Sequence, residues 1–325
     1  MTFWEGKNVL ITGANGFIGS YVTKALVDKG ANVTALIRDK IPNSNLILSG
    51  TANKINLIEG CLTDIDVIKR ALNEYEIDTI FHLAAQAIVT TANRSPLSTF
   101  ESNIKGTWNV LEACRLHELT KRVVIASSDK AYGDQEKLPY TEESPLLGLY
   151  PYDASKACAD ILSQSYHKTY KLPVAITRLA NTYGGGDLNF SRIIPDTIRA
   201  IINNKAPIIR SDGTPVRDYM YVEDAASAYI TLAENLDNEE VVGKGFNFGT
   251  NTPVSVIELV NKMLKAANSE LKPVIQGTAK SEIDKQYLDS SKVKRIMGWE
   301  PKFSLDEGLK ATIEWYNQNL TKIEK

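Results

Sequence analysis

Short apolar runs alternate with amphipathic segments through the first 180 residues of the chain. The apolar runs lie at 8–12, 32–37, 55–60, 79–85, 122–128 and 173–179, and each has the length of a β-strand. The segments between them place apolar residues three or four positions apart, which is the period of a helix with one buried face. Strands that alternate with helices in this way predict an α/β fold, a doubly wound parallel sheet of the Rossmann type with helices on both faces.

The pattern changes after residue 180. A glycine-rich loop covers 181–189, and shorter strands and helices follow it, including a strand at 245–249. We therefore expect a dinucleotide-binding domain over residues 1–180 and a smaller mixed α/β lobe over residues 181–325, with the chain free to cross back to the sheet. No repeat, low-complexity stretch or clean linker separates the two, so a shared cleft is expected.

The first strand leads into a glycine turn, ITGANGFIG, and then into a helix and a second strand. Gly13, Gly16 and Gly19 allow a tight turn, close approach of the backbone to a pyrophosphate, and close packing of helix against strand. Free N–H groups at the start of the helix, with the positive end of its dipole, can hold phosphate oxygens. The turn therefore predicts a dinucleotide site. Three further residues of the turn are expected to line it: Asn15, Phe17 and Ile18.

Ligands of parallel sheets bind beyond the carboxyl ends of the strands, so residues that follow a strand are the next candidates. The strand at 32–37 ends in Arg38 and Asp39. Arg38 favours NADP over NAD, because a guanidinium can bind a 2′-phosphate, whereas Asp39 would suit a 2′-hydroxyl. Asp64, after the third strand, could bind the adenine amine and is equally suited to cap a helix. After the fourth strand, three apolar residues are expected to line the cofactor: Leu83, Ala84 and Ala85.

The bulk composition narrows the class of partner. The 325 residues include 37 basic and 39 acidic side chains without a basic block, which argues against nucleic acid and anionic membranes. No apolar stretch is long enough to span a bilayer, and the N-terminus runs directly into the first strand, so a cytoplasmic protein is expected. The three cysteines are scattered without a ligand set, so neither a metal site nor a disulfide framework is predicted.

The segment 122–156 carries the candidate catalytic residues. Tyr152 and Lys156 are four positions apart, which on a helix places both side chains on one face. An ammonium beside a phenol favours the phenolate, so we expect a lowered pKa and a base near neutral pH at Tyr152. Ser128, at the end of a strand, can hydrogen-bond the same substrate oxygen.

With these motifs the chain resembles the extended short-chain dehydrogenases/reductases, the family of nucleotide-sugar epimerases and dehydratases. The matching segments cover almost the whole chain in family order: ITGANGFIG, HLAAQ (82–86), SSDKAYG (127–133), YDASK (152–156), RLANTYG (178–184) and GTPVRDYMYVEDAA (213–226). The resemblance implies a large NAD(P)-binding domain and a small nucleotide-sugar domain. It also implies a homodimer formed through two helices of the large domain, here near 99–117 and 152–170.

Within the family, the triplet SDK at 128–130 discriminates best. Epimerases tend to carry small or apolar residues after the serine, whereas dehydratases carry two ionisable ones, and Asp-Lys with HLAAQ is closest to the CDP-glucose 4,6-dehydratase branch. The resemblance implies that Tyr152 takes the C4 hydroxyl proton as hydride leaves C4. Lys130 then removes the C5 proton, Asp129 protonates the departing C6 hydroxyl, and hydride returns to C6. The expected activity is that of an NADP-dependent nucleotide-sugar 4,6-dehydratase.

The resemblance also suggests how the substrate is held. Asn181 matches the position that contacts the sugar-nucleotide phosphate and Arg217 the position that contacts the pyrophosphate, where an Arg fork suits the oxygens. Arg192 is a second candidate for the same charge. Gln86, the last residue of HLAAQ, is a candidate for contact with the substrate at a strand end.

Three other interpretations stay open. A partial-cycle enzyme could use the same residues on a 5,6-unsaturated sugar, and a 4-epimerase or 4-reductase would need neither Asp129 nor Lys130. A non-catalytic NADP-binding sensor would keep the fold without the chemistry, but the intact Ser128, Tyr152 and Lys156 argue against it. The nucleotide base and the sugar follow from loop shape, which residue spacing does not specify.

Overall fold

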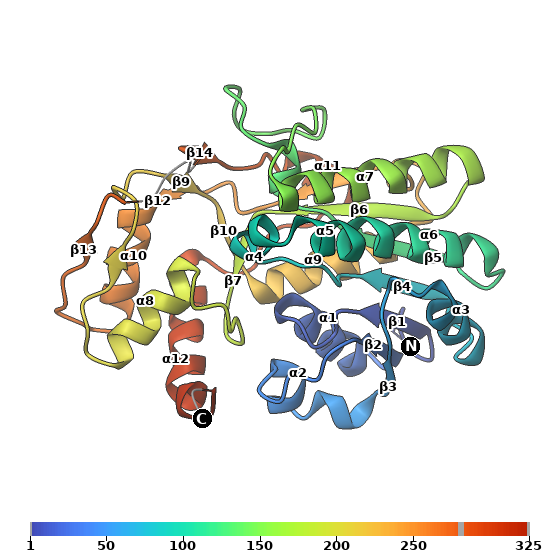
Figure 1. Cartoon of the computed structure of the whole chain (residues 1–325), viewed down its shortest axis with the longest axis horizontal. Coiled ribbons are helices and arrows are strands. Elements are labelled where there is room, and N and C mark those ends of the chain that lie inside the picture. The colour runs from blue at the N-terminus through green and yellow to red at the C-terminus, as the bar shows by residue number, and fades with distance from the viewer. Residues whose placement is uncertain (1, 279–282, 324–325) are drawn as a thin grey trace.

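The computed structural model describes residues 2–278 and 283–323. Seven parallel strands form its main sheet in the order β11-β6-β5-β4-β1-β2-β3 (Figure 1). Their bounds are Asn8–Thr12 (β1), Asn32–Ile37 (β2), Asn56–Glu59 (β3), Thr79–His82 (β4), Arg122–Ala126 (β5), Val174–Leu179 (β6) and Gly245–Phe248 (β11). From β1 the chain winds first toward β3 and then toward β6, which is the doubly wound arrangement that the alternating pattern predicts.

Helices cover both faces of this sheet, because successive side chains of a strand point to opposite sides. Val9 and Ile11 of β1 belong to a core shared with α1 (Phe17–Asp28) and α9 (Val222–Glu234). Leu10 belongs to the opposite core, shared with α3 (Ile65–Glu74) and α6 (Gly106–Leu116). On that second face α7 (Pro151–Tyr170) runs beside α6 (Figure 1).

Shorter helical segments connect these layers. A π-helical turn at 101–105 joins α5 to α6, so that 96–116 forms one nearly continuous helical run, as the sequence indicates. The short helices are α2 (Asn45–Leu48), α4 (Val89–Arg94), α5 (Pro96–Phe100) and α11 (Ser291–Met297).

The chain after residue 180 contributes both to the main sheet and to a smaller lobe. It returns to the sheet through α9, which packs on α1, and through β11, which pairs with β6. The strands of the smaller lobe are β7 (Asn181–Tyr183), β8 (Ile208–Ile209), β9 (Val216–Arg217), β10 (Tyr219–Tyr221), β12 (Val254–Ser255), β13 (Val274–Ile275) and β14 (Lys285–Gln286). Its helices, which enclose a third core, are α8 (Ile193–Ile202), α10 (Val256–Ala266) and α12 (Leu305–Ile323) (Figure 1).

Two features of the described chain bear on its partners. No helix in residues 2–278 and 283–323 is both long and apolar enough to cross a membrane. Within the same residues, His, Cys, Asp and Glu side chains form no group that could hold a metal ion.

Candidate active site

A cavity of about 1050 Å³ lies at the carboxyl ends of the main-sheet strands and extends under the smaller lobe. This volume is at the upper end of the range of small-molecule sites, about 300–1000 Å³. Apart from Asp64, every candidate residue of the sequence analysis lines the cavity, from the glycine turn to the arginines of the smaller lobe. Residues as far apart in the sequence as Gly13 and Arg217 thus line one cavity, as expected for ligand sites beyond the carboxyl ends of parallel strands.

The glycine turn has the shape of a pyrophosphate cradle. Gly13 has a φ of +77°, and a Cβ there would lie 2.7 Å from the backbone N of Ala84. A Cβ on Gly19 would lie 2.0 Å from the carbonyl oxygen of Gly13, so α1 can pack this closely only without a side chain. Gly16 is the N-cap residue of α1. Among the described residues, no capping side chain hydrogen-bonds to the N–H groups at the start of this helix, and its first turn contains no acidic residue. The positive end of α1 therefore points at the cavity and suits a dinucleotide phosphate.

The end of β2 holds the two residues that bear on the choice between NADP and NAD. Arg38 Nε donates to Asp39 Oδ2 at 2.7 Å, and both side chains are about two-thirds exposed. Asn15 Nδ2 donates to the carbonyl oxygen of Asp39 at 2.6 Å, which fixes this corner to the glycine turn. The residues expected to act as alternatives are therefore partners in an exposed ion pair, which is itself worth at most about 1 kcal/mol.

Asp64 takes the capping role, one of the two roles that the sequence leaves open. Its carboxylate accepts a hydrogen bond from Asp66 N at 3.0 Å, so it caps α3. The residues of this segment that line the cavity are its neighbours Cys61, Leu62 and Thr63. In contrast, the run after β4 lines the cavity as predicted: Leu83, Ala84, Ala85 and Gln86.

The serine, tyrosine and lysine are brought together at the end of β5. The helix α7 begins at Pro151, so Tyr152 lies in its first turn and Lys156 one turn later on the same face. Lys156 Nζ lies 5.9 Å from the centroid of the Tyr152 ring and donates to the carbonyl oxygen of Ala126 at 2.7 Å. The Ser128 side chain hydrogen-bonds to Tyr152.

Burial dominates the electrostatics of these residues. It raises the pKa of Tyr152 to about 12, although the hydrogen bond with Ser128 acts in the opposite direction. It also lowers the pKa of Lys156 to about 8. The expectation of a lowered tyrosine pKa is thus wrong for the protein itself, because desolvation of the phenolate outweighs its stabilisation. A ligand that brings positive charge beside Tyr152 would favour the phenolate.

Asp129 and Lys130 lie on a short 3₁₀ turn, Asp129–Tyr132 (η3), directly after the serine. The Ser128 hydroxyl donates to Asp129 Oδ1 at 3.0 Å and accepts from Lys130 N at 3.2 Å, so it caps the turn. Asp129 is only 3% exposed, and Lys130 Nζ donates to Gln286 Oε1. Both residues line the same cavity as Tyr152, which places one carboxyl and one amine in reach of one ligand.

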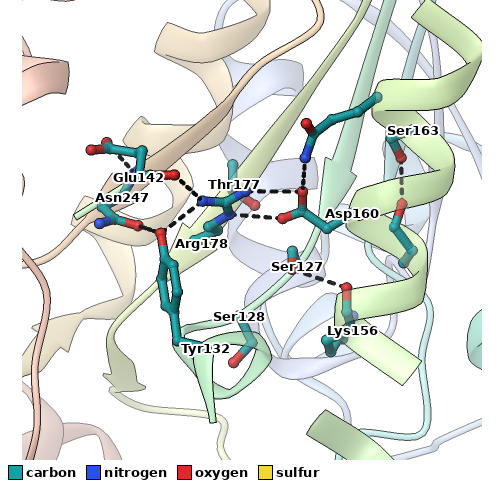
Figure 2. A network of polar contacts seen from close by, with 12 residues as sticks. Ser127, Ser128, Tyr132, Glu142, Lys156, Asp160, Ser163, Thr177, Arg178 and Asn247 are labelled. Carbon is teal, nitrogen blue, oxygen red and sulfur yellow. Dashed lines mark hydrogen bonds and ion pairs between the residues drawn. The ribbon is translucent and has the colours of Figure 1, made fainter. Parts of the chain in front are cut away.

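A buried polar network holds the far end of this turn (Figure 2). Arg178 of β6 makes two hydrogen bonds to the carboxylate of Asp160 on α7, at 2.8 and 3.0 Å. Arg178 Nη1 also donates to the hydroxyl of Tyr132 at 2.7 Å, and this hydroxyl donates to Asn247 Oδ1 at 2.7 Å. Tyr132, the last residue of the turn, is therefore anchored to β6 and β11 and, through Arg178, to α7 (Figure 2).

Asp153, which is not among the residues expected from the sequence, is a buried carboxyl that lines the cavity beside Tyr152. Burial raises the pKa of Asp153 to about 6, while the charge of Lys130 lowers it and that of Asp129 raises it. Its position inside YDASK is the signal that could have found it. Gln286, which contacts Lys130, carries no such signal, since it lies 156 residues further along the chain.

Three residues of the smaller lobe suit the phosphates of a nucleotide. Asn181 Nδ2 is buried and has no hydrogen-bond partner among the described residues, so it is a donor that a ligand oxygen could satisfy. Arg217 is 8% exposed and donates to the carbonyl oxygens of Ile283 and Asp284. Arg192 is paired with Asp187 at 2.9 Å at the cavity wall.

Comparison with known proteins agrees with this geometry. Residues 10–312 match the family model of GDP-mannose 4,6 dehydratase. The chain is 30% identical to CDP-glucose 4,6-dehydratase of Salmonella typhimurium, over 97% of this chain and 91% of that protein. It is 33% identical to a trifunctional UDP-glucose 4,6-dehydratase/UDP-4-keto-6-deoxy-D-glucose 3,5-epimerase/UDP-4-keto-L-rhamnose-reductase of Arabidopsis thaliana. That match covers 98% of this chain, which spans about half (48%) of the length of the plant protein.

Solved structures show the same fold. The UDP-glucose 4-epimerase of Thermotoga maritima, determined with UDP-glucose, has a TM-score of 0.88 at 28% identity, over 96% of this chain and 99% of that one. The dTDP-glucose 4,6-dehydratase of Bacillus anthracis, determined with NAD, has a TM-score of 0.84 at 26% identity, over 97% of both chains. From its glycine turn to its C-terminal lobe, the chain belongs to the GDP-mannose 4,6-dehydratase family, the nucleotide-sugar dehydratase branch of the extended short-chain dehydrogenases/reductases.

Proposed function

We propose that this protein is a nucleotide-sugar 4,6-dehydratase. The observation that carries the proposal is the pair formed by the buried Asp129 and the half-buried Lys130, which shares one cavity with Ser128, Tyr152 and Lys156. Oxidation and reduction at C4 need only the serine, tyrosine and lysine. Elimination of water across C5 and C6 needs an additional base and an additional acid, and the turn after β5 supplies one of each.

A bound nicotinamide dinucleotide supplies the acceptor and later the donor of a hydride. Tyr152 takes the proton of the C4 hydroxyl, with Ser128 hydrogen-bonded to the same oxygen. The C4 ketone acidifies the C5 proton, so Lys130 can remove it while Asp129 protonates the C6 oxygen that leaves as water. Lys130 then returns its proton to C5 as C6 is reduced, and the proton held by Tyr152 replaces the one that Asp129 gave up. The product is a 4-keto-6-deoxy sugar.

The two parts of the chain divide the binding. Residues 1–180 would hold the dinucleotide through the glycine turn, and residues 181–325 would hold the nucleoside diphosphate of the substrate. Asn181 Nδ2, which has no hydrogen-bond partner among the described residues, and the guanidinium of Arg217 support this assignment, because both can donate to phosphate oxygens. Arg192 is the third donor at this wall of the cavity.

The two candidate dinucleotides are supported by different observations. Arg38 at the end of β2 supports NADP, because its guanidinium can leave Asp39 for a 2′-phosphate. The NAD held by the dTDP-glucose 4,6-dehydratase of Bacillus anthracis supports NAD. We propose that Arg38 sets the relative affinity for the two.

We propose that the protein forms a homodimer through the solvent-exposed face of α5, α6 and α7. Exposed apolar side chains occur on the three neighbouring helices α5, α6 and α7: Leu97 at 71%, Trp108 at 42%, Leu116 at 53% and Ile161 at 55% exposure. Covering them with the same helices of a second copy would remove this apolar area from water. Light scattering of the protein and of an Ile161→Glu variant tests this, since the variant should be monomeric.

The experiment for the main proposal is mass spectrometry of incubations with NAD or NADP and a panel of nucleotide sugars. The panel contains CDP-glucose, dTDP-glucose, UDP-glucose, UDP-N-acetylglucosamine and GDP-mannose. Loss of one water from one member supports the dehydratase and identifies its nucleotide. Lys130→Ala is the control, because it should stop water loss while C4 oxidation continues.

A 4-epimerase is the second candidate, favoured by the structural likeness to the Thermotoga maritima UDP-glucose 4-epimerase. It would give an isomer of unchanged mass, and Lys130→Ala would then have little effect. No change across the panel would contradict both activities and leave a partial-cycle enzyme for an unsaturated sugar or a non-catalytic protein.

A further inference from the structure

Gln286 connects the smaller lobe to the turn that carries Asp129 and Lys130. It lies on the two-residue strand β14, and its side chain is fully buried. Its Oε1 accepts a hydrogen bond from Lys130 Nζ, and its Nε2 donates to the backbone oxygen of Asp129 at 3.4 Å. One side-chain amide therefore contacts both residues of the candidate acid–base pair.

The same strand is bound to a candidate pyrophosphate residue. β14 pairs in parallel with β9, and Gln286 lies opposite Arg217 in this register. Arg217 also donates to the carbonyl oxygens of Ile283 and Asp284, immediately before β14. The position of Gln286 therefore depends on the part of the lobe where the nucleotide would bind.

The charge of the acceptor decides what Lys130 can do. A carboxylate at this position would favour the ammonium form, since an opposite charge within about 4–6 Å moves a pKa by about 1–3 units. An amide oxygen orients the amine without a full negative charge, so the proton can still leave. Among the residues that the structure describes, the charged and titratable groups around this contact include Asp129 on the same turn, Asp153 on α7, and Arg217 on β9 next to Gln286.

We propose that Gln286 is a positioning residue that holds the amine of Lys130 in the cavity through a neutral acceptor, and so permits Lys130 to exchange a proton with the substrate. This inference rests on the proposed dehydratase function, in which Lys130 acts at C5. The link to Arg217 further implies that the base is correctly placed only when the nucleotide lobe is in position.

Two variants of the full-length protein test the proposal, Gln286→Glu and Gln286→Met. The first readout needs no substrate: the titration of Lys130, followed by NMR of 15Nζ-labelled lysines and assigned with Lys130→Arg. Gln286→Glu should raise the titration midpoint of Lys130 by about 1–3 units. Gln286→Met, which has similar size but no acceptor oxygen, should lower it.

The second readout separates the two steps of the reaction. At about pH 7, Gln286→Glu should reduce water loss about 10- to 1000-fold, in proportion to the neutral fraction of Lys130. Reduction of the cofactor by the C4 hydroxyl should stay within about twofold, because that step needs only Tyr152 and its partners. Gln286→Met should not show the shift of the water-loss pH profile toward higher pH.

Equal loss of both steps, with no movement of the Lys130 titration in either variant, would overturn the proposal and make Gln286 a packing residue. If the wild-type protein removes water from no nucleotide sugar, the dehydratase assignment fails. The NMR titration then still decides whether Gln286 controls the proton of Lys130, so the two failures are distinguishable.

Discussion

Replacing Asp160 by Asn would leave the guanidinium of Arg178 in the core without its charged partner. The Arg178 side chain is 5% exposed and the Asp160 side chain is 0% exposed. Two nitrogens of the guanidinium donate hydrogen bonds to the carboxylate, at 2.8 and 3.0 Å. Removing one member of such a buried pair costs about 3–5 kcal/mol, because the remaining charge keeps its desolvation penalty. Arg178 keeps the Tyr132 hydroxyl and the Glu142 carbonyl oxygen as acceptors, which favours the lower end of this range.

The free energy of unfolding, measured by urea denaturation, should therefore fall by about 3 kcal/mol in Asp160→Asn. Asp28→Asn is the matched control, since it removes the carboxylate of an ion pair with Lys24 that is half exposed on both sides. The control should lose less than about 1 kcal/mol. Restoring neutrality with the double variant Asp160→Asn/Arg178→Met should recover part of the loss.

A loss below about 1 kcal/mol in Asp160→Asn, similar to the control, would contradict this prediction. It would mean that the charge of Arg178 is solvated or satisfied by its other partners. The ion pair would then not be what anchors Tyr132 and the turn that carries Asp129 and Lys130 (Figure 2).

Three further predictions follow from the site. Tyr152→Phe should reduce the rate of cofactor reduction by about 10²- to 10⁴-fold with unchanged cofactor affinity, and an unimpaired single-turnover absorbance change would remove Tyr152 from its role. Burial raises the pKa of Asp153 to about 6 in the folded protein, compared with about 3.9 in an unfolded chain. Above about pH 6 the buried carboxylate is ionised and destabilises the fold, and this penalty disappears as the pH falls from about 6 to about 4. Asp153→Asn should thus be about 3 kcal/mol more stable than wild type at about pH 8 and equal to it near pH 4, and urea titrations that show no pH dependence of this difference would contradict the assignment. Arg38→Ala should weaken NADP binding about tenfold in fluorescence titrations while NAD binding stays constant, and an equal effect on both would show that Arg38 makes no contact with a 2′-phosphate.

The elements with local signals could be predicted from the sequence. The apolar run at 8–12, the glycines and the amphipathic helix after them each carry their own pattern, and the structure confirms β1, the turn and α1. The strand-end rule also located most of the cavity lining, because all parallel strands bring their carboxyl ends to one edge. At Asp64 the sequence could not decide, because a helix cap and a ligand contact have the same sequence signature; the structure shows the cap.

The rest depends on tertiary contacts that spacing does not contain. Gln286 reaches Lys130 only because β14 pairs with β9, which joins segments almost 70 residues apart. The pKa of Tyr152 depends on how completely the surrounding chain excludes water, and the distance to Lys156 along the helix says nothing about that. That Asn181 Nδ2 finds no hydrogen-bond partner in the described part of the chain is likewise a result of tertiary packing, which the sequence does not show.

The central claim is that hydrogen moves from C4 to C6 within one active site as water leaves. The most direct measurement uses the nucleotide sugar that loses water in the panel, labelled with deuterium at C4, and locates the label in the product by NMR. We expect deuterium in the new C6 methyl group, with no net consumption of cofactor. Deuterium that stays at C4, or is released entirely to solvent, would contradict the dehydratase mechanism.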